Sequence, residues 1–385
     1  MVITRQSERA PSLLRAYIHT LEGKLEPREQ AVLTTLEQER PAWSERFPQA
    51  LNAARHGILE RLVNAMLREN LFGMGERQIR IVGEKVRCEE GGRERSTEVV
   101  EASECQDQSQ GQSQGQSQDP SCDTCDALIS SDSELFHETL STLAQQGWNA
   151  PEWCFLPLHG LHGDSSLLAL PIIREYGYGR LELAARPLHL RRFGREPYTI
   201  RQLSHPVELL KLWRDEVIQS GDLPLDTLDA FAEEIADSTA NLALALCGAQ
   251  VRRKELQTEA SAAGQTTLLD YLTARRRADD TFSPLVFLES WIIDGHPIHP
   301  GTKLKQGMAT SDLLRFAPEF AATPDLEFVA VHHALLETQS IDELSMTERL
   351  YLEHPEVALA AETDLAKKGL SISDYHIVPV HPWQR

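Results

Sequence analysis

The segment "GHPIHPGTKLKQG" (residues 295–307) contains two histidines, two lysines, two prolines and three glycines. Each of its two His-Pro steps has a proline that lacks an N–H donor and restricts the residue before it. The segment is therefore predicted to be an extended or turning loop. The lysines and glycines after Pro300 add positive charge and a backbone that can approach anionic oxygens. The sequence predicts a site for a nucleotide or a carboxylate.

Four side chains of this loop are candidates for contact with an anion: His296, His299, Lys303 and Lys305. A zinc site is the competing interpretation of the two histidines. Their His-x-x-His spacing is shorter than in common zinc sites, companion ligands are missing, and the lysines would repel a cation. We therefore expect an anion site and no metal site.

A second motif of this kind lies in "YHIVPVHPWQR" (residues 375–385), where an apolar strand runs into a His-Pro step. Because strand ends commonly open onto ligand clefts, His381 and Gln384 are candidates for the same pocket as the 295–307 loop. A His-Pro turn that only closes a core strand explains the pattern equally well. Both interpretations stay open on spacing alone.

Two other segments have the apolar periodicity of helices. The first covers residues 50–70, and the second covers residues 225–247, with Gly248 as its predicted stop. Three polar residues interrupt the apolar pattern of the second helix, and we expect them to face solvent: Ser238, Thr239 and Asn241. Residues 78–86 alternate as a short strand does.

The composition changes sharply between Glu89 and Ser133, where Glu, Ser, Gln, Gly and Asp dominate and "QSQGQSQGQSQ" repeats at residues 108–118. Such a segment has nothing apolar to bury, so a disordered insertion is predicted. The chain then divides into an N-terminal helical region (1–88), this insertion (89–133) and a C-terminal region (134–385).

The strongly negative net charge of the chain limits the kinds of partner that it can bind. The chain of 385 residues carries 58 acidic and 38 basic residues, a net charge of −20, which argues against general binding to nucleic acid or to anionic membranes. No run approaches ~20 apolar residues, and the N-terminus does not resemble a signal peptide. We therefore expect a cytoplasmic protein whose anion site is a local basic island.

Other candidate groups carry weaker signals. The six cysteines form no secreted disulfide framework, and the pair Cys122 and Cys125 lacks the second pair of a zinc finger. His159 and His162 repeat the three-residue spacing but lie among glycines, which favours a turn. A group of arginines is either a basic patch or surface decoration: Arg191, Arg192, Arg195 and Arg201.

The stretches "ESWIIDGHPIHPGTKLKQG", "RFAPEF" and "IVPVHPWQ", in this order, resemble the N-terminal half of the NRPS-independent siderophore synthetases, the IucA/IucC family. Weaker similarity extends back through "FAEEIADSTANLALAL" to about residue 135. The loop is similar to the family pattern G-H-P-x-H-P-x-x-K-x-R-x-G, with Lys305 where arginine is usual. That exchange keeps the charge and loses the bidentate fork. Met308 likewise replaces the usual aromatic residue.

The resemblance implies an acid-amine ligase that uses ATP and Mg²⁺ to adenylate a carboxylate of citrate or a related acid. An amine, a hydroxylamine or an alcohol then attacks the acyl-adenylate to give an amide or an ester. It also implies that His296, His299 and Lys303 contact ATP phosphates or the adenylate. Lys305 would assist, Gly307 would permit close backbone approach, and His381 and Gln384 would build the carboxylate pocket.

The fold that the resemblance implies is α+β: an N-terminal helical unit, then mixed helices and antiparallel strands that lead into an incomplete palm-like catalytic domain. The family's downstream Ser-x-Arg-Thr segment is not in the sequence. Activity would then require a C-terminal half, on this chain or on a partner, and a homodimer is plausible for the family. A non-catalytic remnant or scaffold is the alternative, and the identity of the acid and of the nucleophile stays open.

Overall fold

The computed structural model describes residues 25–76, 78–82, 85–90, 93–98, 133–158, 165–194, 196–221, 223–321, 323–339 and 344–384. The chain forms two compact units. Unit 1 consists of the described residues up to Thr266 together with Ile292–Gly307, and unit 2 consists of Thr267–Trp291 and the residues from Met308 onward. The predicted anion-binding loop is therefore part of unit 1, whereas His381 is part of unit 2.

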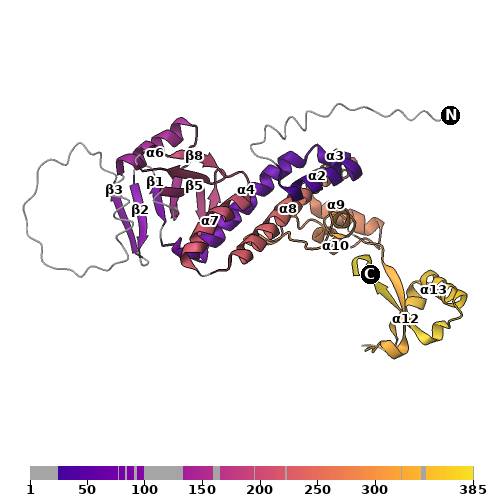
Figure 1. The fold of residues 1–385 in the computed structure, drawn as a ribbon. Coiled ribbons are helices and arrows are strands. Elements are labelled where there is room, and N and C mark those ends of the chain that lie inside the picture. The colour runs from indigo at the N-terminus through magenta and orange to yellow at the C-terminus, as the bar shows by residue number, and fades with distance from the viewer. Residues whose placement is uncertain are drawn as a thin grey trace, which may run out of the picture. The chain divides into compact units, whose positions relative to one another are not determined.

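Unit 1 contains an antiparallel sheet, which in the described residues has eight strands in the order β3-β2-β1-β4-β5-β7-β8, with β6 paired to β5 (Figure 1). The strands are β1 (Ile79–Val82), β2 (Lys85–Glu90), β3 (Arg93–Glu98), β4 (Glu152–Leu158), β5 (Ser165–Tyr176), β6 (Arg180–Leu183), β7 (Leu188–Arg192) and β8 (Thr199–Gln202). The predicted strand at 78–86 thus forms β1 and the start of β2. Strands β2 and β3 extend into the segment predicted as an insertion, and residues 99–132 lie outside the described residues, so the insertion stays a prediction.

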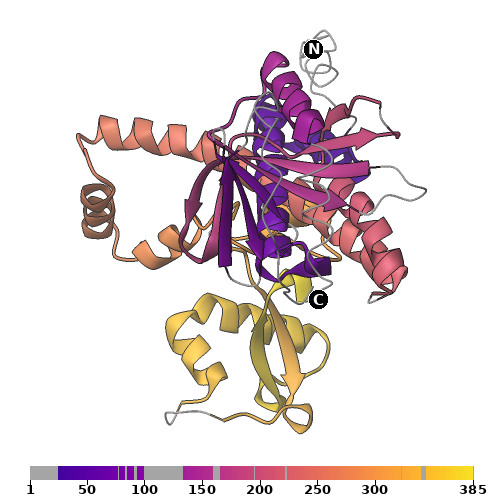
Figure 2. The same ribbon diagram turned by 90° about the vertical axis from the view of Figure 1, so that its left-hand side faces the viewer.

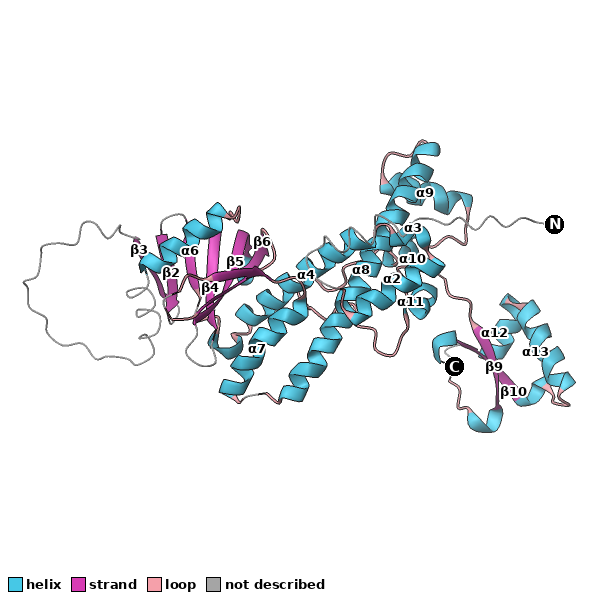
Figure 3. Cartoon of the chain, turned by 45° about the horizontal axis from the view of Figure 1, so that its top comes forward, coloured by secondary structure: helices cyan, strands magenta, loops and turns pink. Residues whose placement is uncertain are grey.

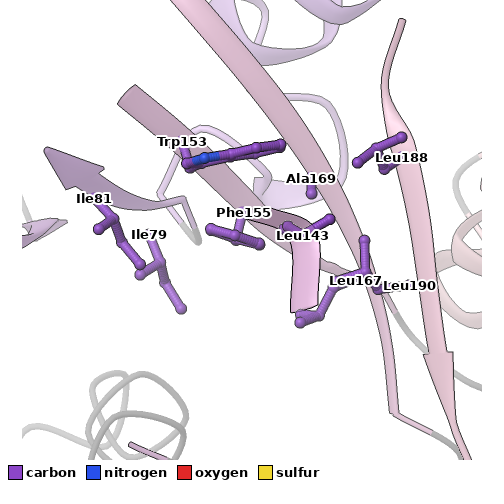
Figure 4. Packing of buried hydrophobic residues seen from close by; sticks show 9 residues of the cluster. All are labelled: Ile79, Ile81, Leu143, Trp153, Phe155, Leu167, Ala169, Leu188 and Leu190. Carbon is purple, nitrogen blue, oxygen red and sulfur yellow. The ribbon is translucent and has the colours of Figure 1, made fainter. Parts of the chain in front are cut away.

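One face of this sheet carries an apolar core (Figure 4). Side chains alternate between the two faces of a strand, so two alternate residues from each of β1, β4, β5 and β7 reach this core. Helix α6 (Ser133–Gln145) covers the same face through Leu143. The residues of the core are Ile79, Ile81, Leu143, Trp153, Phe155, Leu167, Ala169, Leu188 and Leu190.

Apart from α6, the described helices of unit 1 pack around its longest helix, α8 (Figures 1 and 3). They are α2 (Pro27–Glu39), α3 (Pro41–Ser44), α4 (Phe47–Arg68), α7 (Pro206–Ser220) and α8 (Leu225–Ala262), with short 3-10 turns at Leu71–Gly73 and Gly177–Gly179. Helix α4 confirms the predicted helix at 50–70. Its apolar stripe, which includes Ile58 and Leu62, is buried.

The predicted stop of the second helix at Gly248 is wrong, because α8 continues to Ala262. Residues 251–262 are rich in Arg, Lys, Glu, Gln and Ala, which favour helix, and a glycine inside a helix costs only about 1 kcal/mol. The cost of one glycine is smaller than the combined helix preference of the residues that follow it.

Helices α2, α4 and α7 meet at the buried carboxylate of Glu29, which is 0% exposed. Arg55 donates from Nε to Glu29 Oε1 at 2.9 Å and from Nη2 to Oε2. His205 caps α7, and its Nε2 lies 3.2 Å from Glu29 Oε1. Burial alone would raise the pKa of Glu29, but the hydrogen bonds and charges of His205 and Arg55 outweigh it and lower the pKa from 4.5 to about 2.

We predict that Glu29→Gln destabilises the protein by about 3 kcal/mol at neutral pH, because the guanidinium of Arg55 stays buried without its carboxylate. Since the folded pKa of Glu29 is depressed, its contribution to stability is present above 4.5 and is lost as the pH falls toward about 2. Denaturant unfolding over this range should show a shallower loss in the variant than in the wild type. The exposed Glu37→Gln on the same helix is the control, and equal pH profiles for wild type and Glu29→Gln would contradict the prediction.

Unit 2 combines helices with a two-stranded antiparallel ribbon of β9 (Glu327–His332) and β10 (Tyr375–Val380). Helices α12 (Met346–Glu353) and α13 (Pro355–Lys367) lie on one side of the ribbon (Figure 2), where Leu350, Leu365 and Ile377 form a core. The other elements are α9 (Leu268–Ala278), α10 (Pro284–Glu289), α11 (Thr310–Phe316) and 3-10 turns at His333–Leu335, Ile372–Asp374 and Pro382–Gln384.

Both units therefore join helices to antiparallel strands, and the predicted α+β class is confirmed. No helix among the described residues is long and apolar enough to cross a membrane. The predicted division into segments 1–88, 89–133 and 134–385 does not coincide with the two compact units, and as a statement about domains it stays a prediction.

Candidate functional site

The segment between α10 and α11 is irregular, as its His-Pro steps predict. Two polar contacts of Thr302 fix its first half. The Oγ1 of Thr302 accepts a hydrogen bond from the N–H of His296 at 2.7 Å and donates to the carbonyl of Asp294 at 3.3 Å. Gly295 lies between these partners with φ +66°, and a Cβ added there would lie 2.1 Å from Thr302 Oγ1. Only glycine fits this position without displacing Thr302.

We predict that Gly295→Ala disrupts the loop far more than Gly307→Ala. Both glycines have positive φ, but the space around Gly307 is open, so only Gly295→Ala adds a collision to the backbone strain. The extra cost should be about 1–3 kcal/mol of unfolding free energy. Thermal unfolding of the two variants measures the difference, and equal melting temperatures would contradict the assigned role of Gly295.

The rings of the two histidines are oriented by the prolines that follow them. Because proline has no N–H, the first backbone donor after each histidine is two residues ahead. The N–H of Gly301 donates to Nδ1 of His299 at 3.1 Å, and the N–H of Ile298 donates to Nδ1 of His296 at 3.5 Å. An accepting Nδ1 carries no proton, so the neutral ring holds its proton on Nε2. Both exposed imidazoles therefore present an Nε2–H donor.

The second half of the loop is held by α8. The hydroxyl of Ser238 donates to the carbonyl of Pro300 at 2.9 Å and accepts from the N–H of Lys303 at 3.2 Å. The amide of Asn241 donates to the carbonyl of Lys303 at 3.0 Å. The Oδ2 of Asp237 accepts from the N–H of Lys305 at 3.0 Å.

The expected solvent exposure of the polar residues in α8 is wrong. Ser238 and Thr239 are 0% exposed, and Asn241 is 4% exposed. Ser238 and Asn241 face the loop, whereas Thr239 donates to the carbonyl of Ile235 within its own helix. The sequence signal was a set of polar residues at helical spacing inside an apolar run, and it does not say whether such a face meets solvent or another segment.

The negative charge that α8 brings to the loop is balanced from α2. The guanidinium of Arg28 lies 2.7 Å from Asp237 Oδ1 and also donates to Asn241 Oδ1 at 3.4 Å. Asp237 thus binds the loop backbone while its charge is paired. Sequence reasoning did not select Arg28, Asp237 or Thr302, since none of them stands out within its own segment.

The two lysines occupy different environments. Lys303 is only 7% exposed, and its ammonium donates to the carbonyl of Ile292 at 3.2 Å. Lys305 is exposed, as are His296, His299 and Gly307. The structure thus brings these five predicted residues together on one loop, with Lys303 turned inward. Their contact with a ligand stays a prediction.

The second predicted pair lies in unit 2 at the end of β10. The N–H of Trp383 donates to Nδ1 of His381 at 3.2 Å, so this His-Pro step has the same turn as the loop histidines. The ring of His381 meets Phe316 edge-on, with centroids 5.1 Å apart. Gln384 lies in the last 3-10 turn, and its side chain is outside the described structure. A carboxylate pocket at these residues stays a prediction.

Among the candidate arginines, Arg192 is buried over the ring of Tyr198, and Arg191 lies over Phe193. Arg201 pairs with Glu208 at 3.0 Å. Outside the described residues lie Cys122, Cys125, His159, His162 and Arg195. Within the described part of the chain, no group of three or more His, Cys, Asp or Glu side chains is arranged to hold a metal ion.

Comparison with known proteins agrees with the loop's pattern. The model of the IucA / IucC family matches residues 284–385, a segment that contains both His-Pro motifs. The resemblance found in the sequence is therefore confirmed, and residues 284–385 are similar to this family.

Two curated relatives match different lengths of the chain. D-ornithine–citrate ligase of Staphylococcus aureus is 25% identical over 217 residues, which is 56% of this chain and 30% of the relative. The rhizobactin siderophore biosynthesis protein RhbC of Rhizobium meliloti is 35% identical over 99 residues, 26% of this chain and 16% of the relative. The chain thus spans less than a third of the length of either relative.

Solved structures of similar proteins include the petrobactin biosynthesis protein AsbB of Bacillus anthracis, with a TM-score of 0.47 and 14% identity, covering 94% of this chain and 41% of that one. The ATP-bound aerobactin synthetase IucA of Klebsiella pneumoniae matches with a TM-score of 0.40 and 19% identity, covering 61% and 35%.

Proposed function

We propose that this chain is the part of a siderophore synthetase that binds ATP for the adenylation of citrate or a related carboxylic acid. The observation that carries the proposal is the match of residues 284–385 to the IucA / IucC family, because this segment includes the whole His-Pro loop. The names of relatives, among them a D-ornithine–citrate ligase and an L-2,3-diaminopropanoate–citrate ligase, support citrate as the acid and an amine as the nucleophile.

The chemistry of adenylation fits the groups on the loop. ATP and a carboxylate are both anions, so fixed donors and cations must offset their repulsion and stabilise the charge that develops at the α-phosphoryl group. His296 and His299 present Nε2–H donors, and Lys305 adds an exposed ammonium. In this proposal Mg²⁺ arrives on the ATP phosphates, where it reduces their negative charge.

Lys303 has a different part in this proposal. Its ammonium carries three N–H donors, and the bond to the carbonyl of Ile292 fixes the direction of the side chain. A largely buried ammonium also acts in a lower dielectric than one in water, so its attraction for a phosphate oxygen is stronger. We infer that Lys303 is the principal cation of the site and that Lys305 assists it.

The proposal also covers the second step of the reaction, in which the nucleophile attacks the adenylate. The matched segments cover less than a third of these relatives, so we propose that a C-terminal half, on the same protein or on a partner, completes the site and admits the amine or alcohol. A homodimer and a cytoplasmic location are parts of the same hypothesis. A non-catalytic scaffold of the same family is the alternative that the experiments below test.

We predict that Lys303→Ala lowers adenylation by at least about 100-fold, as expected when a preorganised cation at a developing charge is removed. The assay is pyrophosphate release with ATP, Mg²⁺, citrate and hydroxylamine as a surrogate nucleophile, on the protein that carries this chain. Circular dichroism checks that the variant is folded. Unchanged pyrophosphate release from folded Lys303→Ala refutes the role of the lysine, and an inactive wild type supports the scaffold.

We predict in addition that Lys305→Arg lowers the KM for ATP by about 2- to 5-fold. A guanidinium binds two phosphate oxygens through its planar fork, whereas an ammonium acts as a point charge. The anchor of this position is its main-chain N–H on Asp237, which the exchange leaves in place. A KM that rises in Lys305→Arg would show that residue 305 does not face the phosphates.

A further inference from the structure

A single buried hydroxyl connects α8 to both ends of one turn of the loop. Ser238 Oγ donates to the carbonyl of Pro300 and accepts from the N–H of Lys303, so it fixes two main-chain atoms three residues apart. The N–H of Leu304 closes the same turn on the carbonyl of Gly301 at 3.1 Å. Because Ser238 is 0% exposed, water has no access to replace its hydroxyl.

Two neighbours on the same helix extend this anchor. Asp237 and Asn241 are four residues apart and lie on one face of α8, and the amide of Asn241 donates to Asp237 Oδ2 at 2.8 Å. Asn241 donates to the carbonyl of Lys303, and Asp237 accepts from the N–H of Lys305. Through these three side chains, α8 binds main-chain atoms of Pro300, Lys303 and Lys305.

We propose that Ser238, supported by Asp237 and Asn241, is a positioning residue that sets where Lys303 and His299 stand toward the nucleotide. The inference rests on the proposed function, because it assumes that the loop binds ATP. Since these bonds from α8 are made to the backbone, they do not require a particular side chain at 303 or 305. In this proposal the bonds from α8 fix the position of the loop backbone, and the lysines supply the positive charge that attracts the phosphates.

The pairing of Asp237 with Arg28 is part of the same device. A carboxylate that binds the N–H of Lys305 would repel an approaching phosphate if its charge were uncompensated. Arg28, at 2.7 Å, balances that charge while Asp237 keeps its hydrogen bond to the loop. The hydrogen bond from the loop to Asp237 is thus compatible with an anion site on the same loop.

The test compares Ser238→Ala with Thr239→Val. Both remove one hydroxyl from a fully buried position of α8, but Thr239 bonds only to its own helix, so the pair separates anchoring from general destabilisation. We expect amide hydrogen exchange at Lys303 and Leu304 to quicken at least about 10-fold in Ser238→Ala and to stay near wild type in Thr239→Val. The control variant, Thr239→Val, keeps the hydrogen bonds between Ser238 and the loop and removes only a bond within α8.

The second readout is steady-state kinetics of pyrophosphate release. We expect Ser238→Ala to raise the KM for ATP about 10-fold and to lower kcat less, because a displaced loop binds the nucleotide poorly, whereas Thr239→Val should change neither. A merely structural role of Ser238 would lower the amount of folded enzyme and leave the KM of the folded fraction unchanged.

The two readouts keep two failures apart. If exchange quickens in Ser238→Ala but the wild type neither binds ATP nor releases pyrophosphate, the anchor stands and the proposed function fails. If exchange and KM are the same in Ser238→Ala and Thr239→Val, the positioning role is overturned while the proposed function is untouched.

Discussion

The hydrogen bonds between the buried polar face of α8 and the backbone of the 295–307 loop are the constraint on which the candidate site depends. Burying a hydroxyl or an amide without a partner costs about 1–3 kcal/mol, so Ser238 and Asn241 require partners inside the protein. An irregular loop has the complementary need, because its main-chain groups lack the partners that a helix or a sheet provides. Each segment therefore satisfies the other, and the loop acquires one defined course.

Much of the fold follows from the sequence, and its failures have a common cause. The helix at 50–70 and the irregular loop follow from local rules of periodicity and proline chemistry. The exposure of Ser238 and Asn241 does not, because an amphipathic pattern shows that a face is polar without showing what it meets. The contact that buries them joins residues more than sixty positions apart, as the 62-residue separation of Ser238 and Pro300 shows.

The sequence likewise predicts which residues form the candidate site but not how all of them are oriented. Residue types and spacing identify the histidines and lysines of the loop, and the His-Pro steps explain why the Nδ1 atoms of both rings accept backbone N–H groups. The inward turn of Lys303 depends on the carbonyl of Ile292, eleven residues away, which no motif indicates. Likewise, the pairing of Glu29 with Arg55 and His205 joins three helices and leaves no signature in any one of them.

The most direct test of the central claim, that this loop binds ATP, is ¹⁵N NMR of the imidazoles during a titration with Mg²⁺–ATP. The account predicts that the Nε2 signals of His296 and His299 move together as ATP saturates the protein, whereas the signals of His205, which is buried against Glu29, stay unchanged. Saturation with ATP that leaves both loop histidines unchanged would contradict it.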